Sequence, residues 1–283
     1  MEKQKRAVAI HDISCIGKCS LTVALPVLSA AGIECSVIPT SVLSSHTGDF
    51  IGYTFRDLGA DILPILDHWG TLDLHVDAIY TGYLGSTEQT RLMEIAFNRL
   101  SGPDTLIFVD PVMGDNGKLY AGFDSDFPAQ MAALCRRAHV IAPNITEASF
   151  LLGEPYFPPP HTSAYIKTLI RRLSEAFAVK VALTGVQLNE DQVGAASFDP
   201  ADGVIRYCMR PHAPGRYHGT GDLFGSAFLS GLLSDLPLHE AAALAVAFVS
   251  DAIAKTPKHH DLKYGVRFEA ALPGFMQALG VFP

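Results

Sequence analysis

A short run before an expected helix combines the residue types that phosphoryl transfer needs: His218, Gly219, Thr220, Gly221 and Asp222. Glycine lets successive backbone N–H groups turn toward one point, and a helix N-terminus adds unpaired donors and partial positive charge. Together they make an anion cradle that needs no Lys or Arg. The carboxylate of Asp222 stands beside this cradle, where it could accept a proton from an attacking hydroxyl group.

The same run also fits a purely structural role, because glycine-rich helix starts with an acidic cap are common. Spacing alone leaves both interpretations of Asp222 open, a general base or a helix cap. Other phosphate motifs do not occur. A Walker A motif fails because Cys19 follows Gly17-Lys18, and the dinucleotide fingerprint fails because the third glycine is Gly225 rather than residue 224.

Polar and acidic residues also follow the other expected strands. In chain order these residues are Asp12, Ser14, Thr47, Tyr83, Asp110, Asp115, Asn144, Glu147, Thr184 and Gly185. In open α/β sheets, ligands bind beyond the carboxyl ends of the strands. Lys and Arg are nearly absent from these ends. Acidic groups suit a phosphate site where a divalent metal ion bridges them to the phosphates.

The elements that must position these residues alternate between short β-branched runs and longer amphipathic segments. Strands are expected at 7–10, 35–38, 78–80, 106–109, 140–142 and 179–183, and helices at 21–31, 56–68, 87–100, 126–138, 146–152 and 163–177. This alternation predicts a mostly parallel α/β sheet with helices on its faces. Runs 195–198 and 204–209 predict an antiparallel hairpin at the sheet edge. Helices at 222–233, 238–254 and 267–279 close what we expect to be one domain, 1–283.

Composition narrows the functional class. The 283 residues carry a net charge of −8 with 48% hydrophobic residues, which excludes a mainly disordered chain and disfavours nucleic-acid or anionic-membrane partners. Five scattered cysteines, with no second pair to complete a zinc site, predict a reducing compartment. The apolar run 241–249 is too short to cross a bilayer, and the N-terminal residues lack a signal-peptide core. We therefore expect a cytoplasmic protein.

With these residues in view, the sequence resembles the pyridoxal kinases, the vitamin B6 kinase branch of the ribokinase-like superfamily. The resemblance covers essentially the whole chain and rests on Ser45-His46-Thr47-Gly48, Thr81-Gly82-Tyr83, Asp110-Pro111-Val112-Met113-Gly114-Asp115, Asn144 with Glu147, and Gly219-Thr220-Gly221-Asp222. The last motif marks the superfamily and the others narrow it to the B6 branch. The resemblance implies a three-layer αβα fold, a homodimer, and phosphorylation of the 5′-hydroxymethyl group of pyridoxal, pyridoxamine or pyridoxine by Mg·ATP.

The resemblance also implies roles for single residues. Asp222 matches the catalytic base, and Gly219, Thr220 and Gly221 match the anion hole. The matching nucleotide-binding residues are Asp110, Asp115, Asn144, Thr184, Gly185, Gly219, Thr220 and Phe224. Asp110 and Glu147 match the metal-binding positions for Mg²⁺, and residues 184–185 lie where relatives place the phosphates or a monovalent cation such as K⁺. The matching substrate-binding residues are Asp12, Ser14, Thr47, Tyr83 and His218. Residues 115–122 match a loop that covers the nucleotide.

Three positions depart from the pattern of the relatives. Asp12 stands where many relatives have a Ser that touches the pyridine ring, so it could contact the substrate or act as a structural cap. His218 replaces an aliphatic residue, and Ala142 replaces a Thr that could help hold a monovalent cation. The preferred vitamer is therefore left open. Two other functions are kept: a hydroxymethylpyrimidine kinase, and a non-catalytic pyridoxal phosphate binder on the same fold.

Overall fold

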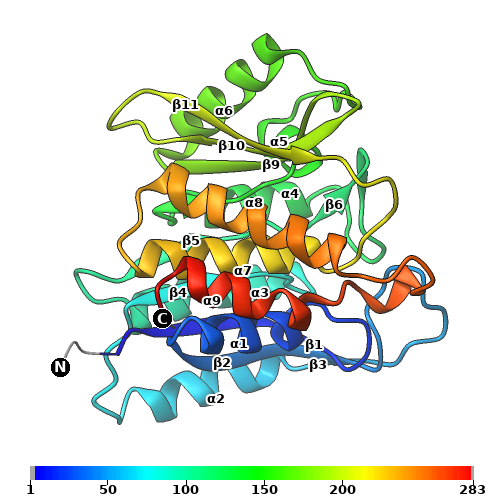
Figure 1. Ribbon diagram of the computed structural model, residues 1–283. Helices are drawn as coiled ribbons and strands as arrows, with labels where there is room; N and C mark the ends of the chain where they lie inside the picture. The colour runs from blue at the N-terminus through cyan, green and yellow to red at the C-terminus, as the bar shows by residue number, and fades with distance from the viewer. Residues whose placement is uncertain (1–3, 282–283) are drawn as a thin grey trace.

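A twisted nine-stranded sheet runs through the computed structural model, which describes residues 4–281 (Figure 1). The strand order is β11-β10-β9-β8-β5-β4-β1-β2-β3. The strands are β1 (Arg6–Ser14), β2 (Glu34–Leu43), β3 (Phe55–Asp57), β4 (Ala78–Thr81), β5 (Leu106–Val109), β8 (Val140–Ile141), β9 (Lys180–Asn189), β10 (Gln192–Phe198) and β11 (Ile205–Pro211). Strands β2, β1, β4, β5, β8 and β9 are parallel. The predicted mostly parallel α/β sheet is confirmed.

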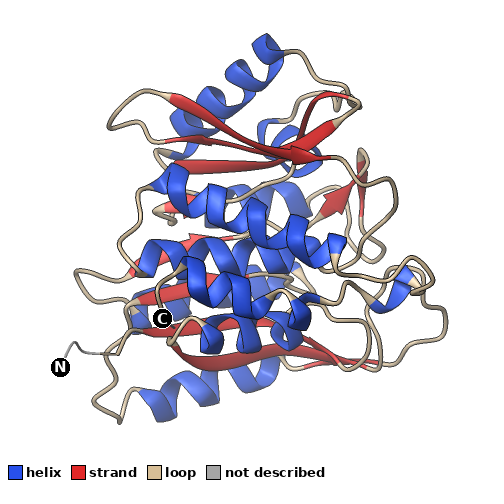
Figure 2. Ribbon diagram, viewed as in Figure 1, coloured by secondary structure: helices blue, strands red, loops and turns tan. Residues whose placement is uncertain are grey.

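Helices cover both faces of the sheet (Figure 2). They are α1 (Leu21–Ala30), α2 (Gly59–Trp69), α3 (Thr87–Leu100), α4 (Phe127–Cys135), α5 (Ile145–Leu152), α6 (Ser163–Phe177), α7 (Thr220–Leu233), α8 (Leu238–Ala254) and α9 (Leu272–Ala278). One core cluster joins the sheet to α2–α6, and a second joins it to α1, α7, α8 and α9. Both faces of the sheet are buried. The central strands are therefore continuous apolar runs and do not alternate between apolar and polar residues.

The antiparallel edge hairpin is also confirmed. Strand β10 pairs antiparallel with both β9 and β11, and the sheet ends there. The opposite edge carries a second antiparallel strand, β3, which pairs with Ser41–Leu43 of β2. The sequence analysis placed these residues in a helix over 56–68. That prediction was wrong at its start, because residues 55–57 complete the sheet edge and Asp57 accepts a hydrogen bond from the Gly59 N–H (2.6 Å), just as α2 begins.

The last predicted helix, 267–279, was also wrong as a single element. The chain forms a short 3₁₀ turn, η2 (Phe268–Ala270), and then α9, with Pro273 in the first turn of α9. Proline lacks the N–H that would continue a helix through this point, but it fits a helix start. Another 3₁₀ turn, η1 (Leu262–Tyr264), precedes it. The sequence analysis also missed a two-stranded hairpin, β6 (Gly114–Asp115) with β7 (Lys118–Leu119), inside the expected loop 115–122.

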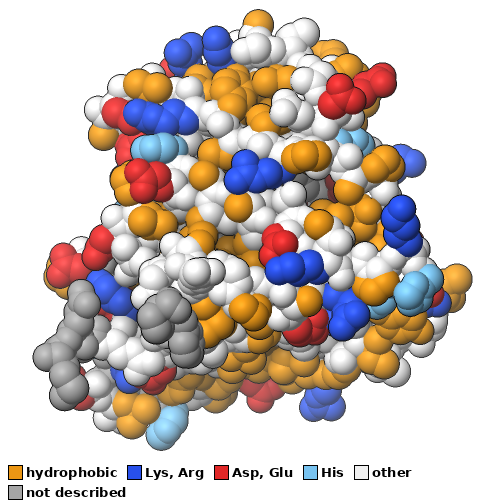
Figure 3. All heavy atoms as spheres, viewed as in Figure 1, with side chains coloured by type: hydrophobic (Ala, Val, Ile, Leu, Met, Phe, Trp, Pro, Cys, Tyr) orange, Lys and Arg blue, Asp and Glu red, His pale blue; other side chains and the backbone are white. Residues whose placement is uncertain are grey.

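The visible surface shows no concentrated basic region. Figure 3 shows Lys and Arg side chains dispersed among Asp and Glu on the face that carries α7, α8 and α9. No helix within residues 4–281 combines the length and the apolar character that crossing a membrane requires.

Candidate active site

The predicted site residues converge because parallel strands end at the same edge. Main-chain hydrogen bonds continue the sheet just past these ends: Gly82 N donates to Ile10 O (3.1 Å), and Asp110 N donates to Thr81 O (3.0 Å). Farther along the edge, Thr184 N donates to Pro143 O (2.9 Å). The residues that follow β1, β4, β5, β8 and the first half of β9 therefore form one row. Strand β1 itself runs on to Ser14 and strand β9 to Asn189, so Asp12, Ser14, Thr184 and Gly185 lie within strands rather than after them.

Helix α7 begins at this edge with the Gly-Thr-Gly-Asp run. Gly219 is the N-cap residue with φ +76°, and Thr220 opens the helix. Asp222 is an acidic residue of the first turn, and α7 has no side-chain cap. Asp222 is therefore not the N-cap residue of α7, and its role as a general base stays a prediction. The first N–H groups of a helix have no intrahelical acceptor, so the start of α7 presents donors and partial positive charge.

Three carboxyl groups lie together near the start of α7. Burial is the main cause that raises the pKa of Asp222 to about 7; the charge of the nearby Asp12 also raises this pKa, and the backbone N–H groups of Ser20 and Asp222 lower it. Burial raises the pKa of Glu147 to about 8 against the effect of backbone N–H donors. The pKa of Asp110 is raised well above its ordinary value by burial and then by the charges of Glu147 and Asp222. These raised pKa values show that the site brings several acidic groups together where burial and mutual repulsion disfavour their charged forms.

Such a pocket fits a divalent cation that is shared with phosphates. Within residues 4–281, no group of three or more His, Cys, Asp or Glu side chains could by itself hold a metal ion. Mg²⁺ does not require such a cage, since it keeps several waters and binds through one or two carboxylates together with substrate phosphates. Asp110 and Glu147 supply oxygens of the type that Mg²⁺ prefers.

Asn144 and Glu147 form a capping box at the start of α5. Asn144 Oδ1 accepts from the Glu147 N–H (2.9 Å), and Glu147 Oε2 accepts from the Asn144 N–H (2.8 Å). Asn144 Nδ2 also donates to Gly114 O (2.9 Å), and Gly117 N donates to Thr146 Oγ1 (3.0 Å). These bonds attach the β6–β7 hairpin to α5. The exposed Asp115 accepts from its neighbour Asn116 instead (2.9 Å).

The predicted substrate residues form two groups. Asp12 and Ser14 are buried and bonded to each other, with Ser14 Oγ donating to Asp12 Oδ2 (2.8 Å). Burial and the nearby Asp12 raise the pKa of Tyr83 to about 12. His218 Nε2 lies 2.6 Å from Asp49 Oδ2, and its ring lies 4.6 Å from that of His46. The half-buried Thr47 lies between His46 and Asp49 in the same loop.

The remaining nucleotide candidates differ in placement. Gly185 is exposed with φ +69°, and Thr184 is half-buried. Phe224 is 6% exposed and stacks on Phe228 at a ring distance of 5.6 Å, within the core under α7. The roles expected for these residues stay predictions. The sequence analysis missed Ser20 and Asp49. A serine just before an expected helix was a signal for Ser20, whereas no spacing rule would have selected Asp49.

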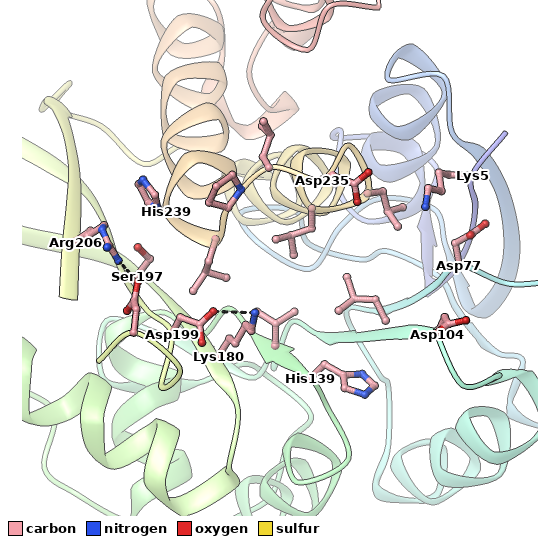
Figure 4. A pocket seen from close by; sticks show the side chains of 18 residues that line it. Lys5, Asp77, Asp104, His139, Lys180, Ser197, Asp199, Arg206, Asp235 and His239 are labelled. Atoms are coloured by element: carbon pink, nitrogen blue, oxygen red, sulfur yellow. Dashed lines mark hydrogen bonds and ion pairs between the residues drawn. The ribbon is translucent and has the colours of Figure 1, made fainter. Parts of the chain in front are cut away.

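A hollow of about 560 Å³ lies elsewhere, at the opposite end of the sheet (Figure 4). It is lined by the start of β9, the end of α7 and the start of α8, and none of the predicted site residues reaches it. Two of its cations are paired, since Lys180 lies 2.8 Å from Asp199 and Arg206 lies 2.5 Å from Asp202. This hollow is therefore not the site where the predicted residues converge.

Comparisons with known proteins identify the family of this chain. The family model described as phosphomethylpyrimidine kinase matches residues 65–267. A pyridoxine/pyridoxal/pyridoxamine kinase of Bordetella bronchiseptica is 30% identical over 269 residues, which cover 88% of each chain. Among solved structures, a Bacteroides thetaiotaomicron protein assigned as a phosphomethylpyrimidine kinase and crystallised with pyridoxal is 35% identical, with a TM-score of 0.92 over 96% of each chain. The pyridoxal kinase of Lactobacillus plantarum is 32% identical, with a TM-score of 0.88 over 97% of this chain and 98% of that one.

Proposed function

This chain belongs to the pyridoxal kinases of the ribokinase-like superfamily, and on that premise we propose that it transfers the γ-phosphoryl group of ATP to the 5′-hydroxymethyl group of a B6 vitamer. The observation that carries the proposal is the placement of Asp222 in the first turn of α7, directly after the Gly219-Thr220-Gly221 cradle. Its pKa, raised to about 7, makes it a base of useful strength near neutral pH.

In the proposed reaction, Asp222 orients the substrate hydroxyl and takes its proton while the hydroxyl oxygen attacks the γ-phosphorus. The new oxygen–phosphorus bond forms as the bond to the β–γ bridging oxygen breaks, and ADP leaves. The backbone N–H groups at the start of α7 receive the charge that develops on the phosphoryl oxygens. Mg²⁺, when bound, neutralises phosphate charge, and Asp110 and Glu147 would hold it together with water.

We assign the nucleotide to Asp110, Asp115, Asn144, Thr184, Gly185 and the start of α7. The β6–β7 hairpin, fixed to α5 by Asn144 and Thr146, is suited to limit the access of water to the phosphates. The vitamer ring is assigned to the opposite side, where it would contact Asp12, Ser14, Thr47, Tyr83 and His218. K⁺ dependence remains a prediction, to be read as the change in turnover when Na⁺ replaces K⁺.

The test of the proposal is a substrate panel. Purified protein is incubated with Mg·ATP and pyridoxal, pyridoxamine, pyridoxine or hydroxymethylpyrimidine, and ADP formation is followed. We expect ADP and a 5′-phosphorylated product with at least one B6 vitamer. The second candidate function is the phosphorylation of hydroxymethylpyrimidine, which the matched family model and the Bacteroides protein favour. ADP formation with hydroxymethylpyrimidine and with none of the B6 vitamers would support this second function. No ADP with any acceptor would favour a non-catalytic binder.

Three broader expectations also stay proposals. Residues 1–283 are proposed to fold as one domain, which a single calorimetric unfolding transition would support. The chain is proposed to form a homodimer. Light scattering that gives only the mass of one 30.4 kDa protomer would contradict this proposal. A cytoplasmic location is the third, and cell fractionation tests it.

A further inference from the structure

A hydrogen bond links the loop after β2 to the segment that precedes the anion cradle. Asp49 lies in this loop, residues 44–54, and its Oδ2 is 2.6 Å from His218 Nε2, although the two residues are 169 positions apart in the chain. His218 immediately precedes Gly219, the N-cap residue of α7. Thr47, which is assigned to the vitamer ring, lies two residues before Asp49. The bond therefore connects the side of the site assigned to the vitamer with the side assigned to the phosphates.

The His218 ring is enclosed on three sides by residues of this loop. The ring of His46 packs against it at a centroid distance of 4.6 Å, and the Gly48 backbone lies so close that a Cβ there would be 2.6 Å from His218 Cε1. Asp49 contacts the third side through Nε2. The His218 side chain is 12% exposed, whereas that of Asp49 is 44% exposed. The loop therefore sets the orientation of the buried ring, and a side chain at position 48 would displace it.

The hydrogen-bond roles in this contact follow from the chemistry of its two groups. The hydrogen bond with His218 lowers the pKa of Asp49, so its carboxylate is ionised near neutral pH and can only accept hydrogen bonds. His218 Nε2 is therefore the donor. Asp49 also has φ +62°, in the left-handed region that Asp and Asn adopt more readily than other residues with side chains. Asn at this position would keep both the backbone conformation and an acceptor.

The loop is anchored on its other side to the 3₁₀ turn η1. His46 Nε2 lies 2.6 Å from Lys263 O, and Phe50 packs edge-on against Tyr264 at a ring distance of 5.4 Å. Phe50 also packs edge-on against His46, at a ring distance of 4.8 Å. These contacts do not involve Asp49. Removing its carboxylate therefore leaves the loop attached to η1 and releases its hydrogen bond to the start of α7.

We propose that Asp49 is a positioning residue that couples the two sides of the site, because its bond to His218 holds the loop 44–54 against the start of α7. This role rests on the proposed function. A vitamer in contact with Thr47 and His218, and a nucleotide with its phosphates at the anion cradle, would each stabilise the same arrangement of loop and helix start. Two ligands that favour one arrangement bind with positive coupling, and the same factor applies to both affinities. Each ligand should therefore bind more tightly when the other is present.

The test measures this coupling by calorimetry in the full chain. The Kd for pyridoxal is determined with and without a saturating non-hydrolysable ATP analogue and Mg²⁺. We expect the analogue to tighten the binding of pyridoxal to the wild-type protein about fivefold or more. Asp49→Gly removes the carboxylate and tolerates φ +62°, and it should reduce this effect to less than about twofold. Asp49→Asn keeps an acceptor for His218 and should retain most of the coupling.

Two further variants show whether the coupling runs through His218. His218→Leu removes the hydrogen bond from its other end, and combined with Asp49→Gly it should cause little further loss of coupling beyond either change alone. Arg216→Gln is the matched control, because it removes the exposed ion pair with the other oxygen of Asp49 (3.2 Å) and leaves the bond to His218 in place. It should keep the coupling within about twofold of the wild-type value.

Thermal melts check that each variant is folded, and if Asp49→Gly is not, His218→Leu and Arg216→Gln decide the question. A wild-type protein whose affinity for pyridoxal does not change with the analogue would overturn the positioning role. Full coupling in Asp49→Gly, or a loss of coupling in Arg216→Gln, would overturn it as well. The proposed function fails separately, if the wild-type protein forms no ADP with any B6 vitamer.

Discussion

The Cα of Gly219 faces the carbonyl oxygen of Lys18 so closely that a Cβ on Gly219 would lie 2.0 Å from that oxygen. Gly219 also has φ +76°, a conformation that disfavours side chains. This contact joins the anion cradle at the start of α7 to the turn after β1. The cradle therefore depends on the absence of a side chain for two independent reasons.

Gly219→Ala should lower the free energy of unfolding by about 2–3 kcal/mol, from the left-handed backbone and the contact with Lys18 O. Gly221→Ala is the control, since a Cβ there meets no atom within 4 Å and its backbone is helical. It should be neutral or stabilise the fold by up to about 1 kcal/mol. Urea unfolding of the two variants measures the difference, and equal stability would contradict the contact.

Asp222→Asn should reduce turnover about 100-fold to 10,000-fold, the range expected for loss of a general base, while ADP affinity stays within about threefold. Asp235→Asn is the control at the other end of α7. Asp235 is exposed at φ +60°, a conformation that Asn tolerates, and it lines the hollow in Figure 4. Steady-state kinetics and calorimetric ADP titration give the two quantities. Near-normal turnover of the Asp222→Asn variant would show that Asp222 is not the general base.

The buried acids predict how stability depends on pH. The ordinary pKa values of 3.8 and 4.5 for Asp222 and Glu147 become about 7 and about 8 in the folded protein. The folded state therefore holds protons that the unfolded chain has released, and the free energy of unfolding should fall as pH rises from about 4 to about 8. Tm across this range measures the fall. Asp110→Asn should make the fall in Tm smaller, because it removes one of the buried acidic groups. A Tm that rises with pH would contradict the raised pKa values of the buried acids.

One buried histidine opposes this trend over part of the same pH range. Burial lowers the pKa of His11 from 6.5 to about 3, so the unfolded chain binds a proton there that the folded chain does not. This residue makes stability rise as pH increases from about 3 to 6.5, against the trend of the acids. Replacing His11 with Gln should remove that contribution. An unchanged difference in Tm between pH 4.5 and 6.5 in the variant would show that His11 is not buried in its neutral form.

Asn144→Ala should have two effects that can be separated. It removes an N-cap of α5, which costs about 1–2 kcal/mol, and it releases the β6–β7 hairpin from Gly114 O. Thr162→Ala removes a comparable N-cap, because Thr162 Oγ1 accepts from Tyr165 N (3.1 Å) at the start of α6. Both variants should lose similar stability, but only Asn144→Ala should raise the KM for ATP. An equal KM for ATP in the Asn144→Ala and Thr162→Ala variants would contradict the link between α5 and the nucleotide.

Local pattern was sufficient for the alternation of strands and helices and for the row of residues at the sheet edge. Each strand end is a local feature, and in a parallel sheet these ends necessarily meet along one edge. The same reasoning failed where packing overrides periodicity. Residues 55–57 are exposed and carry no apolar period, so only their pairing with β2 makes them a strand.

Which carboxylates face one another was decided by the tertiary structure alone. Asp12, Asp110, Glu147 and Asp222 are each ordinary acids in the sequence, and their pKa values depend on burial and on distances between elements far apart in the chain. The contact between Gly219 and Lys18 O joins α7 to the turn after β1, and no local spacing rule specifies it. Residue types determined what chemistry the chain could perform, and packing decided which groups share a site.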